Sequence, residues 1–215
     1  MTLEVKICGI TSAAALAAAA EGGAALVGFV FYPKSPRHLT HEAAAALARA
    51  VPGHILRVGL VVDQSDDAIG ALLGAVSLDM LQLHGSESPE RAAAIRARFG
   101  KPVMKAIAVA EAADLAAADR YVAVADRLLF DGKPPASMPN ALPGGNALPF
   151  DWRLLKGRDW PKPWMLAGGL TAENLAEAVT LSGARRVDVS SGVEDRPGQK
   201  SPAKIKALLD LARTL

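Results

Sequence analysis

Residues 3–31 read LEVKICGITSAAALAAAAEGGAALVGFVF, and this stretch holds one complete repeat of the pattern that organises the chain. The apolar run at 3–9 predicts a strand, and the alanine-rich run at 11–23 predicts a helix that is closed by two glycines. A second strand is predicted at 25–31. A strand, a helix and a strand in this order form a right-handed crossover between parallel strands. The stretch therefore predicts an α/β protein with a parallel sheet.

The same alternation continues to the end of the chain. Short runs rich in β-branched residues predict strands at 54–62, 79–85, 102–109, 126–132, 163–169 and 184–192. Longer alanine- and leucine-rich runs predict helices at 40–51, 65–76, 88–100, 110–121, 150–157, 171–183 and 201–215. Thr40, Ser65 and Ser88 are predicted N-caps, and Pro89 fits the first helical position after Ser88. The one long irregular stretch is 133–149.

Eight strand-and-helix units in 215 residues predict a single (β/α)8 TIM barrel with parallel strands, as one domain over residues 1–215. The alternative is an open, doubly wound sheet. That fold calls for a glycine-rich phosphate turn after the first strand and a carboxylate at the end of the second. CGITS at 8–12 and FVFYP at 29–33 contain neither. A TIM barrel places its active site at the C-terminal ends of the strands, so we expect the functional residues there.

The composition excludes several classes of protein. Hydrophobic residues make up 51% of the chain and charged residues 21%, which indicates a large core rather than a disordered chain. The net charge of +2 is spread over interspersed acids and bases, so no nucleic-acid partner is expected. No uncharged apolar stretch has the length of a membrane span, and the N-terminus carries no export signal. Because a single cysteine cannot form an intramolecular disulfide, we expect a cytoplasmic protein.

Cys8 and Asp131 close the first and sixth predicted strands, which places them across the barrel mouth from each other. A thiol and a carboxyl group that face one pocket suit a general base and a general acid. Asp131 follows the run RLLF, and burial of this kind favours the neutral, proton-donating carboxyl. The Cys8 thiol has an ordinary pKa of about 8.5, so forming the thiolate at pH 7 is unfavourable. A positive environment would reduce this cost, and Arg37 or shielding by the substrate could supply it. The alternatives are a packing residue for Cys8 and a structural carboxylate for Asp131.

The last two units contain a candidate phosphate site. Gly168 and Gly169 lie between a predicted strand and a helix, where a missing Cβ lets backbone N–H groups approach an anion. Ser190, Ser191 and Gly192 end the neighbouring strand and add hydroxyl donors. TIM barrels often bind phosphate with the loops after their last two strands. The alternative is a pair of glycine turns that only connect strand to helix.

Three further polar residues lie at strand ends. Arg37 follows the second strand and its planar fork suits a carboxylate, although it could equally be a solvated loop cation. His84 closes the fourth strand and is either a residue that orients substrate or a packed structural histidine. Asp188 shares one face of the eighth strand with Ser190, so it is predicted to point inward below the pocket, with its role open. Neither metal-ligand spacing nor a nucleotide motif appears, so no metal or cofactor is expected.

Seven motifs together carry a family resemblance: KICGIT at 6–11, FYPKSPR at 31–37, LQLHG at 81–85, LLFDG at 128–132, GGNALPFDW at 144–152, LAGGLTAEN at 166–174 and DVSSGVE at 188–194. In this order they resemble the phosphoribosylanthranilate isomerases of tryptophan biosynthesis. The resemblance implies a cofactor-independent Amadori rearrangement of N-(5-phosphoribosyl)anthranilate to 1-(2-carboxyphenylamino)-1-deoxyribulose 5-phosphate. The expected partner is this small molecule, and the protein is expected to be a monomer or a homodimer.

The resemblance also implies roles for the site residues. Asp131 would be the general acid that protonates the furanose ring oxygen and opens the ring to a Schiff base. Cys8 would be the general base that removes the C2 proton. Arg37 would hold the anthranilate carboxylate, and the turns at Gly168–Gly169 and Ser190–Gly192 would hold the phosphate.

The chain departs from the family at Asn146 and Ala147, where the family has threonine and glycine, which leaves the contacts of that loop open. Two alternatives for the function also stay open. An isomerase of the histidine-pathway type would want an aspartate at the end of the first strand and phosphate turns in both halves. A non-catalytic barrel that binds a phosphate ligand would keep the glycine turns but would not need Cys8 to face Asp131.

Overall fold

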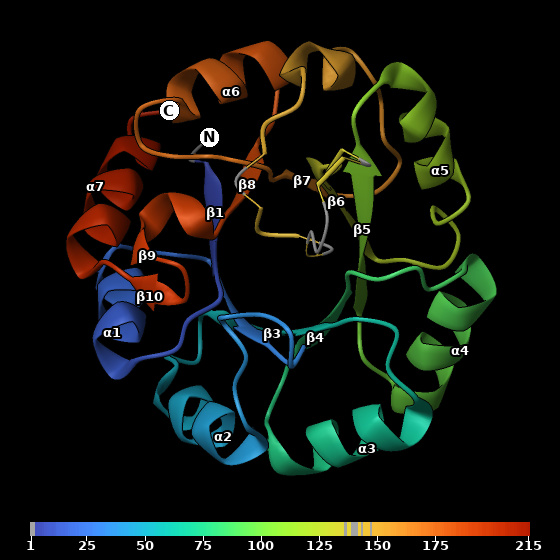
Figure 1. The fold of residues 1–215 in the computed structure, drawn as a ribbon, viewed down its shortest axis with the longest axis vertical. Helices are drawn as coiled ribbons and strands as arrows, with labels where there is room; N and C mark the ends of the chain where they lie inside the picture. The colour runs from blue at the N-terminus through green and yellow to red at the C-terminus, as the bar shows by residue number, and fades with distance from the viewer. Residues whose placement is uncertain (1–2, 136, 139–141, 143, 147) are drawn as a thin grey trace.

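The computed structural model describes residues 3–135, 137–138, 142, 144–146 and 148–215. Eight parallel strands close into a barrel in chain order, and β8 pairs back with β1. Helices surround this barrel in a ring, as Figure 1 shows. The TIM barrel predicted from the sequence is therefore confirmed.

The barrel strands are short and regular: β1 Glu4–Cys8, β2 Leu26–Val30, β3 Leu56–Val61, β4 Met80–Leu83, β5 Val103–Val109, β6 Arg127–Gly132, β7 Trp164–Leu166 and β8 Arg186–Val189. The α-helices are α1 Ala13–Glu21, α2 His41–Ala50, α3 Asp66–Ala75, α4 Pro89–Phe99, α5 Ala116–Asp119, α6 Leu175–Ser182 and α7 Pro202–Ala212. Between these elements lie the short 3-10 helices η1 Ala112–Leu115, η2 Trp152–Leu155 and η3 Ser191–Val193.

The side chains of each strand divide between two cores because successive residues point to opposite faces. On β6, Leu128 and Phe130 pack outward in the large core under the helices, while Leu129 points into the barrel. The buried apolar cluster inside the barrel consists of Leu26, Val58, Met80, Met104, Ala106, Leu129, Met165 and Ala167. Asp131 follows Leu129 by two residues, so the inward face of β6 carries a carboxyl group at its C-terminal end.

Local signals in the sequence set the helix ends. The Thr40, Ser65 and Ser88 hydroxyls each accept a hydrogen bond from the backbone N–H three residues further on, as predicted for N-caps. Pro89 begins α4, where a missing N–H costs no helical hydrogen bond. Gly22 is the C-cap of α1.

Two predicted helices are shorter than expected. The run at 110–121 forms η1 and the single turn α5, because the Asp114 carboxylate accepts hydrogen bonds from the N–H groups of Ala110 and Glu111 and tightens the start. The run at 150–157 forms only η2, since Lys156 is already extended and Gly157 has a φ of +73°. In the predicted loop after β8, the strands β9 Glu194–Arg196 and β10 Gln199–Lys200 form a hairpin.

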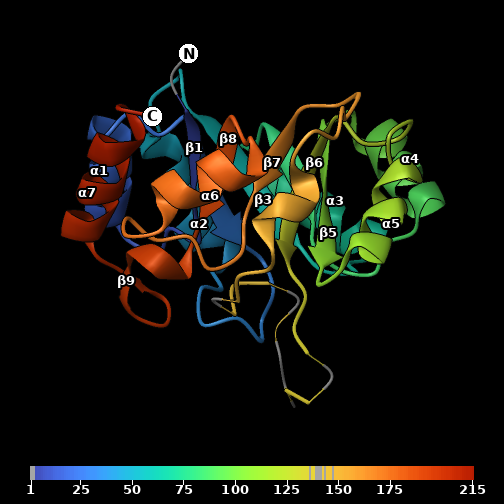
Figure 2. The same cartoon turned by 90° about the horizontal axis from the view of Figure 1, so that it is seen from above.

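Figure 2 shows the barrel from the side. The loop after β2 and the β9–β10 hairpin project from one end of the barrel, and the described part of the segment after β6 projects beside them. The start of β1 and the C-terminus of the chain lie toward the other end. Within the described residues, no helix is long and apolar enough to cross a membrane.

Candidate active site

A pocket opens at the C-terminal ends of the strands, where TIM barrels carry their active sites. Its lining contains all but one of the predicted site residues: Cys8, Arg37, His84, Asp131, Gly168, Gly169, Ser190 and Ser191. Gly192 follows directly, and a Cβ there would collide with the backbone of Leu170. Among the described residues, no group of three or more His, Cys, Asp and Glu is placed to hold a metal ion.

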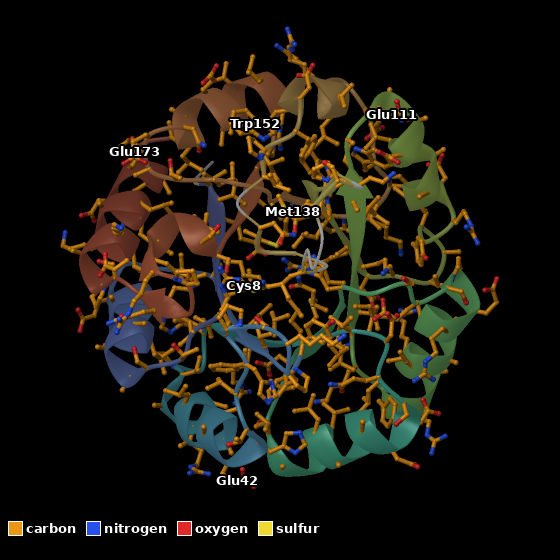
Figure 3. All side chains as sticks on the ribbon, in the orientation of Figure 1. Cys8, Glu42, Glu111, Met138, Trp152 and Glu173 are labelled. Carbon is orange, nitrogen blue, oxygen red and sulfur yellow. The ribbon has the colours of Figure 1, made fainter. Side chains whose placement is uncertain are left out.

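Cys8 ends β1, and its side chain lies inside the ring of helices, 4% exposed (Figure 3). The adjacent strand contributes Gly28, which pairs with Cys8 across the two strands. A Cβ at Gly28 would lie 2.9 Å from the Cys8 Sγ and 3.2 Å from the Lys6 Nζ. The absent side chain therefore leaves the space that the thiol and the ammonium group occupy.

Lys6 precedes Cys8 by two residues, so both side chains point into the barrel. The Lys6 Nζ donates a hydrogen bond of 2.9 Å to Asp188 Oδ1 on β8, and Lys6 is fully buried. Asp188 thus points inward, as its place on the strand predicts. Burial alone would lower the pKa of Lys6, but the charges of Asp188 and of the Cys8 thiolate outweigh it and raise that pKa.

The pKa of the Cys8 thiol lies above its ordinary value. Burial is the largest cause, the positive charge of Lys6 opposes it, and the Asp188 carboxylate adds to the rise. The thiol is therefore mainly neutral at pH 7. The main positive charge acting on the thiol is that of Lys6 and not that of Arg37, so the first of the two sources predicted from the sequence is corrected.

Asp131 is the last residue but one of β6 and is 8% exposed, and its Oδ1 accepts a hydrogen bond of 2.9 Å from the N–H of Gly132. Its Oδ2 lies 3.3 Å from the His84 Nε2, in contact but outside hydrogen-bond geometry. The Gln82 Nε2 donates to the His84 Nδ1 over 2.9 Å. Because an amide nitrogen only donates, Nδ1 is the acceptor, and a neutral His84 carries its proton on the Nε2 that faces Asp131.

Arg37 is buried and its guanidinium is already bound. Nε and one terminal nitrogen donate to the two carboxylate oxygens of Glu194 over 2.7 and 2.9 Å, and that nitrogen also donates to the Gly145 carbonyl over 3.4 Å. This geometry excludes the solvated loop cation. The other terminal nitrogen lies 2.5 Å from the position that a Cβ would take at Gly145, at the edge of the pocket.

Lys200 links this ion pair to the candidate phosphate turn. Its Nζ donates to the Ser190 carbonyl and hydroxyl oxygens over 3.1 and 3.3 Å and to Glu194 Oε1 over 2.5 Å. Gly168 and Gly169 follow the adjacent strand β7, also line the pocket, and have φ values of +87° and +65°, a region that favours glycine. The turn that would receive a phosphate therefore has a buried ammonium group behind it.

The segment after β6 covers one side of the pocket. A Cβ at Gly144 would collide with the His84 ring and lie 2.8 Å from Asp131 Oδ2, so the glycine permits close approach to both residues. The Asn146 amide bridges the backbone of Leu142, accepting from its N–H over 3.1 Å and donating to its carbonyl over 2.6 Å. Ala147, the other departure from the family pattern, lies outside the described residues.

Four residues of this site were not predicted from the sequence: Lys6, Gly28, Glu194 and Lys200. A signal for Lys6 was present, because a lysine two positions before Cys8 in an apolar strand must share its inward face. Glu194 and Lys200 follow the last barrel strand, and only the hairpin folds them back against Arg37.

Comparison with known proteins identifies the family. The family model described as N-(5'-phosphoribosyl)anthranilate (PRA) isomerase matches residues 5–211. The N-(5'-phosphoribosyl)anthranilate isomerase of Cereibacter sphaeroides is 58% identical over 98% of this chain and 99% of its own. The enzyme of that name from Paramagnetospirillum magneticum is 57% identical over 99% of this chain and 98% of its own.

Solved structures agree. The phosphoribosyl anthranilate isomerase of Thermotoga maritima superposes with a TM-score of 0.87 at 37% identity, covering 99% of this chain and all of the other. A second structure, with a TM-score of 0.85 at 36% identity and the same coverage, is a complex with reduced 1-(o-carboxyphenylamino)-1-deoxyribulose 5-phosphate. The chain therefore belongs to the N-(5'-phosphoribosyl)anthranilate isomerase family and is an isomerase of tryptophan biosynthesis.

Proposed function

We propose that the chain converts N-(5-phosphoribosyl)anthranilate to 1-(2-carboxyphenylamino)-1-deoxyribulose 5-phosphate, with Asp131 as general acid and Cys8 as general base. The observation that carries this proposal is that the two groups lie at the C-terminal ends of β1 and β6 and line the same pocket. The similar solved protein that binds a reduced form of this product supports the choice of substrate.

The reaction needs one proton given and one proton taken. Asp131 protonates the ring oxygen as the bond from C1 to that oxygen breaks, which opens the furanose to a protonated Schiff base. The Cys8 thiolate then takes the proton from C2, and the electron pair of that C–H bond neutralises the iminium nitrogen as the enolamine forms. The enolamine tautomerises to the ketone. Asp131 ends as a carboxylate and Cys8 as a thiol, so a proton returns from Cys8 to Asp131, directly or through solvent, before the next turnover.

The raised pKa of Cys8 has two consequences for this step. The thiolate is scarce in the free protein at pH 7, which lowers the fraction of molecules ready to react. Once formed, however, it is a stronger base toward the C2 proton than an ordinary thiolate. The cationic Schiff base in the pocket favours the thiolate by its charge, so we propose that the substrate itself supplies part of the activation.

The pocket offers one site for each end of the substrate. The terminal nitrogen of Arg37 that is not bound to Glu194 would donate to the anthranilate carboxylate, while Glu194 holds Nε and the other terminal nitrogen. The backbone around Gly168–Gly169 and Ser190–Gly192 would hold the phosphate, with the charge of Lys200 behind it. His84 would orient Asp131 or a substrate hydroxyl through its Nε2 proton.

Replacing the acid and the base tests the chemistry. Cys8→Ala and Asp131→Asn should each lower kcat by about 10²–10⁴-fold or more, the usual contribution of general acid–base groups, in an assay that follows the loss of anthranilate fluorescence. Both variants should still bind the reduced product analogue. Asp126→Asn, which changes a carboxylate that binds the N–H of Val103, away from the pocket, is the control. A Cys8→Ala protein with near-normal kcat would refute the base assignment.

Arg37 is tested by comparing two ligands. Arg37→Ala should weaken binding of the reduced product analogue about 10–100-fold, the range for a hydrogen bond to a charged group, and weaken binding of ribulose 5-phosphate much less. Arg57→Ala removes an arginine that is paired with Asp79 over 2.7 Å outside the pocket, so it controls for the loss of an ion pair. Equal losses for both ligands in Arg37→Ala would show that Arg37 does not hold the carboxylate.

A cytoplasmic location and a monomeric or homodimeric state stay predictions. The structure of a relative from Thermotoga maritima describes that protein as dimeric. Sedimentation of the purified chain over a range of concentrations would decide between the two states.

A further inference from the structure

Lys6 is the largest fully buried side chain that carries a charge in the described part of the molecule. It lies inside the barrel below the pocket and forms an ion pair with Asp188, 2.9 Å away. A buried lysine pays a large desolvation cost, and a buried ion pair is weak evidence for stability, since apolar residues often serve better. The position of Lys6 therefore calls for a reason beyond packing.

The reason lies in what else surrounds the ammonium group. The Lys6 Nζ and the Cys8 Sγ occupy the same gap, at 3.2 and 2.9 Å from the position that a Cβ would take at Gly28. This places them within roughly 6 Å of each other, the range over which an opposite charge stabilises a thiolate. Asp188 holds the ammonium group from the other side.

We infer that Lys6 is a positioning residue for the proposed base: its ammonium group, anchored by Asp188, keeps the buried Cys8 thiol able to ionise. The inference rests on the proposed role of Cys8. Lys6 does not line the pocket among the described residues, so it acts on the substrate only through the thiol.

The other charged groups around Cys8 are committed elsewhere. Lys200 faces it from β10, but its Nζ is bound to Glu194 and Ser190. Arg37 is bound to Glu194. On the far side of the pocket, Asp131 and His84 contact each other. Asp188 is an anion and opposes ionisation of the thiol, so without Lys6 the thiolate would form beside an unpaired carboxylate.

Titration of the thiol tests the inference without any turnover. Because Cys8 is the only cysteine, the ultraviolet absorbance of the thiolate against pH, minus that of the Cys8→Ala protein, reports this one group. The key variant is Lys6→Met/Asp188→Asn, which removes both charges and leaves no unpaired carboxylate. Its thiol pKa should exceed that of the unchanged protein, because Lys6 acts on Cys8 more strongly than Asp188 does.

The single variant Lys6→Met should have the highest thiol pKa, raised by about one to three units, which is a ten- to thousand-fold smaller thiolate fraction at a fixed pH below the pKa. Its kcat/KM should fall at pH 7 and recover as the pH rises, while KM changes little. A purely structural role for Lys6 would not produce this alkaline recovery.

A matched control is available in the same barrel. Lys105 is also buried, 3% exposed, and is paired with Glu87 over 2.8 Å, but it does not line the pocket. Lys105→Met should leave the thiol titration unchanged, although it removes a buried lysine from an ion pair. Circular dichroism confirms that each variant is folded before it is titrated.

The outcomes separate the two proposals. If the thiol pKa of the double variant is equal to or lower than that of the unchanged protein, the inference about Lys6 is wrong. This outcome can be read whether or not Lys6→Met folds. If Cys8→Ala keeps its activity, the proposed function of Cys8 is wrong, but the titration still measures the effect of Lys6 on the thiol.

Discussion

A single missing Cβ shapes the reactive end of this site. Gly28 has no side chain on the inner face of β2, and the Cys8 thiol and the Lys6 ammonium group fill the space. A lysine would not be expected inside an apolar barrel, because lysine side chains are almost never fully buried unless they are paired. The placement of the thiol and the ammonium group depends on the glycine opposite them, which the sequence shows only as one glycine in an otherwise apolar strand.

Gly28→Ala should therefore reduce activity through the site rather than through the fold. A methyl group 2.9 Å from Sγ must displace the thiol, at a cost of about 1–3 kcal/mol for overpacking. We expect a lower kcat and an altered thiol titration. Gly59→Ala is the control, because its Cβ would meet the outer-core residue Leu78 instead and should cost stability without changing the thiol titration. Normal kcat in Gly28→Ala would show that the gap has no functional role.

At the residue scale, positions were easier to predict than partners. Strand ends placed Cys8, His84 and Asp131 at the pocket, because the C-terminal ends of parallel barrel strands meet there. The partner of Arg37 could not be predicted, since Glu194 is 157 residues away along the chain and only the closed barrel brings it near.

At the scale of elements, the β9–β10 hairpin connects the proposed carboxylate site at Arg37 with the proposed phosphate turn at Ser190. Its Glu194 accepts hydrogen bonds from both Arg37 and Lys200, and Lys200 reaches back to Ser190. The hairpin turn is fixed from the other side, where the Thr11 hydroxyl donates to the Gly198 carbonyl over 3.0 Å. The proposed carboxylate site and the proposed phosphate turn therefore share one buried carboxylate.

This shared carboxylate predicts a pH dependence of stability. Burial would raise the pKa of Glu194, but Arg37 and Lys200 outweigh it and hold that pKa below its ordinary value of 4.5. A group whose pKa is lowered on folding stabilises the protein above its unfolded pKa, and this stability is lost as the pH falls through the folded pKa. Glu194→Gln should thus cost about 3–5 kcal/mol at neutral pH, as for other broken buried ion pairs.

The difference in free energy of unfolding between the unchanged protein and Glu194→Gln should be constant above about pH 5 and shrink as the pH falls below the unfolded pKa. Urea unfolding at a series of pH values measures it. Asp195→Asn, at an exposed pair with Lys204, is the control and should show little effect at any pH. A difference that stays the same down to acid pH would show that Glu194 does not titrate as described.

Helix starts were predicted better than helix lengths. The caps at Thr40, Ser65 and Ser88 depend only on residues three positions apart, which the sequence displays. The short helices after β5 and β6 depend on a side chain competing for backbone N–H groups at Asp114 and on the left-handed Gly157. Such competition is not visible in apolar periodicity.

At the scale of the whole molecule, the barrel was predictable because its repeat is regular. Eight alternations of strand and helix leave few ways to bury every apolar face, and closure of β8 on β1 removes both sheet edges. The charged interior was less predictable, since Lys6 and Asp188 come from opposite ends of the chain and meet only when the barrel closes. The proposed base therefore lies on β1, one of the two strands whose pairing closes the barrel.

A leucine-to-alanine substitution should affect the protein differently in the core under the helices and in the core inside the barrel. Leu128 and Leu129 are adjacent on β6 and both fully buried, but Leu128 packs outward under the helices and Leu129 packs inside the barrel. Leu128→Ala and Leu129→Ala should each lower the free energy of unfolding by about 2–5 kcal/mol, measured by urea unfolding.

Their effects on kcat should differ, because Leu129 lies directly below Asp131 on the same inward face and Leu128 does not. A cavity under the proposed acid lets its carboxyl group move relative to the substrate, and small displacements of a catalytic group are costly. We therefore expect Leu129→Ala to lower kcat well beyond Leu128→Ala when both are assayed at a temperature where each is fully folded. Equal kcat values would mean that the interior layer supports the fold alone, and that the position of Asp131 is set by its contacts with Gly132 and His84.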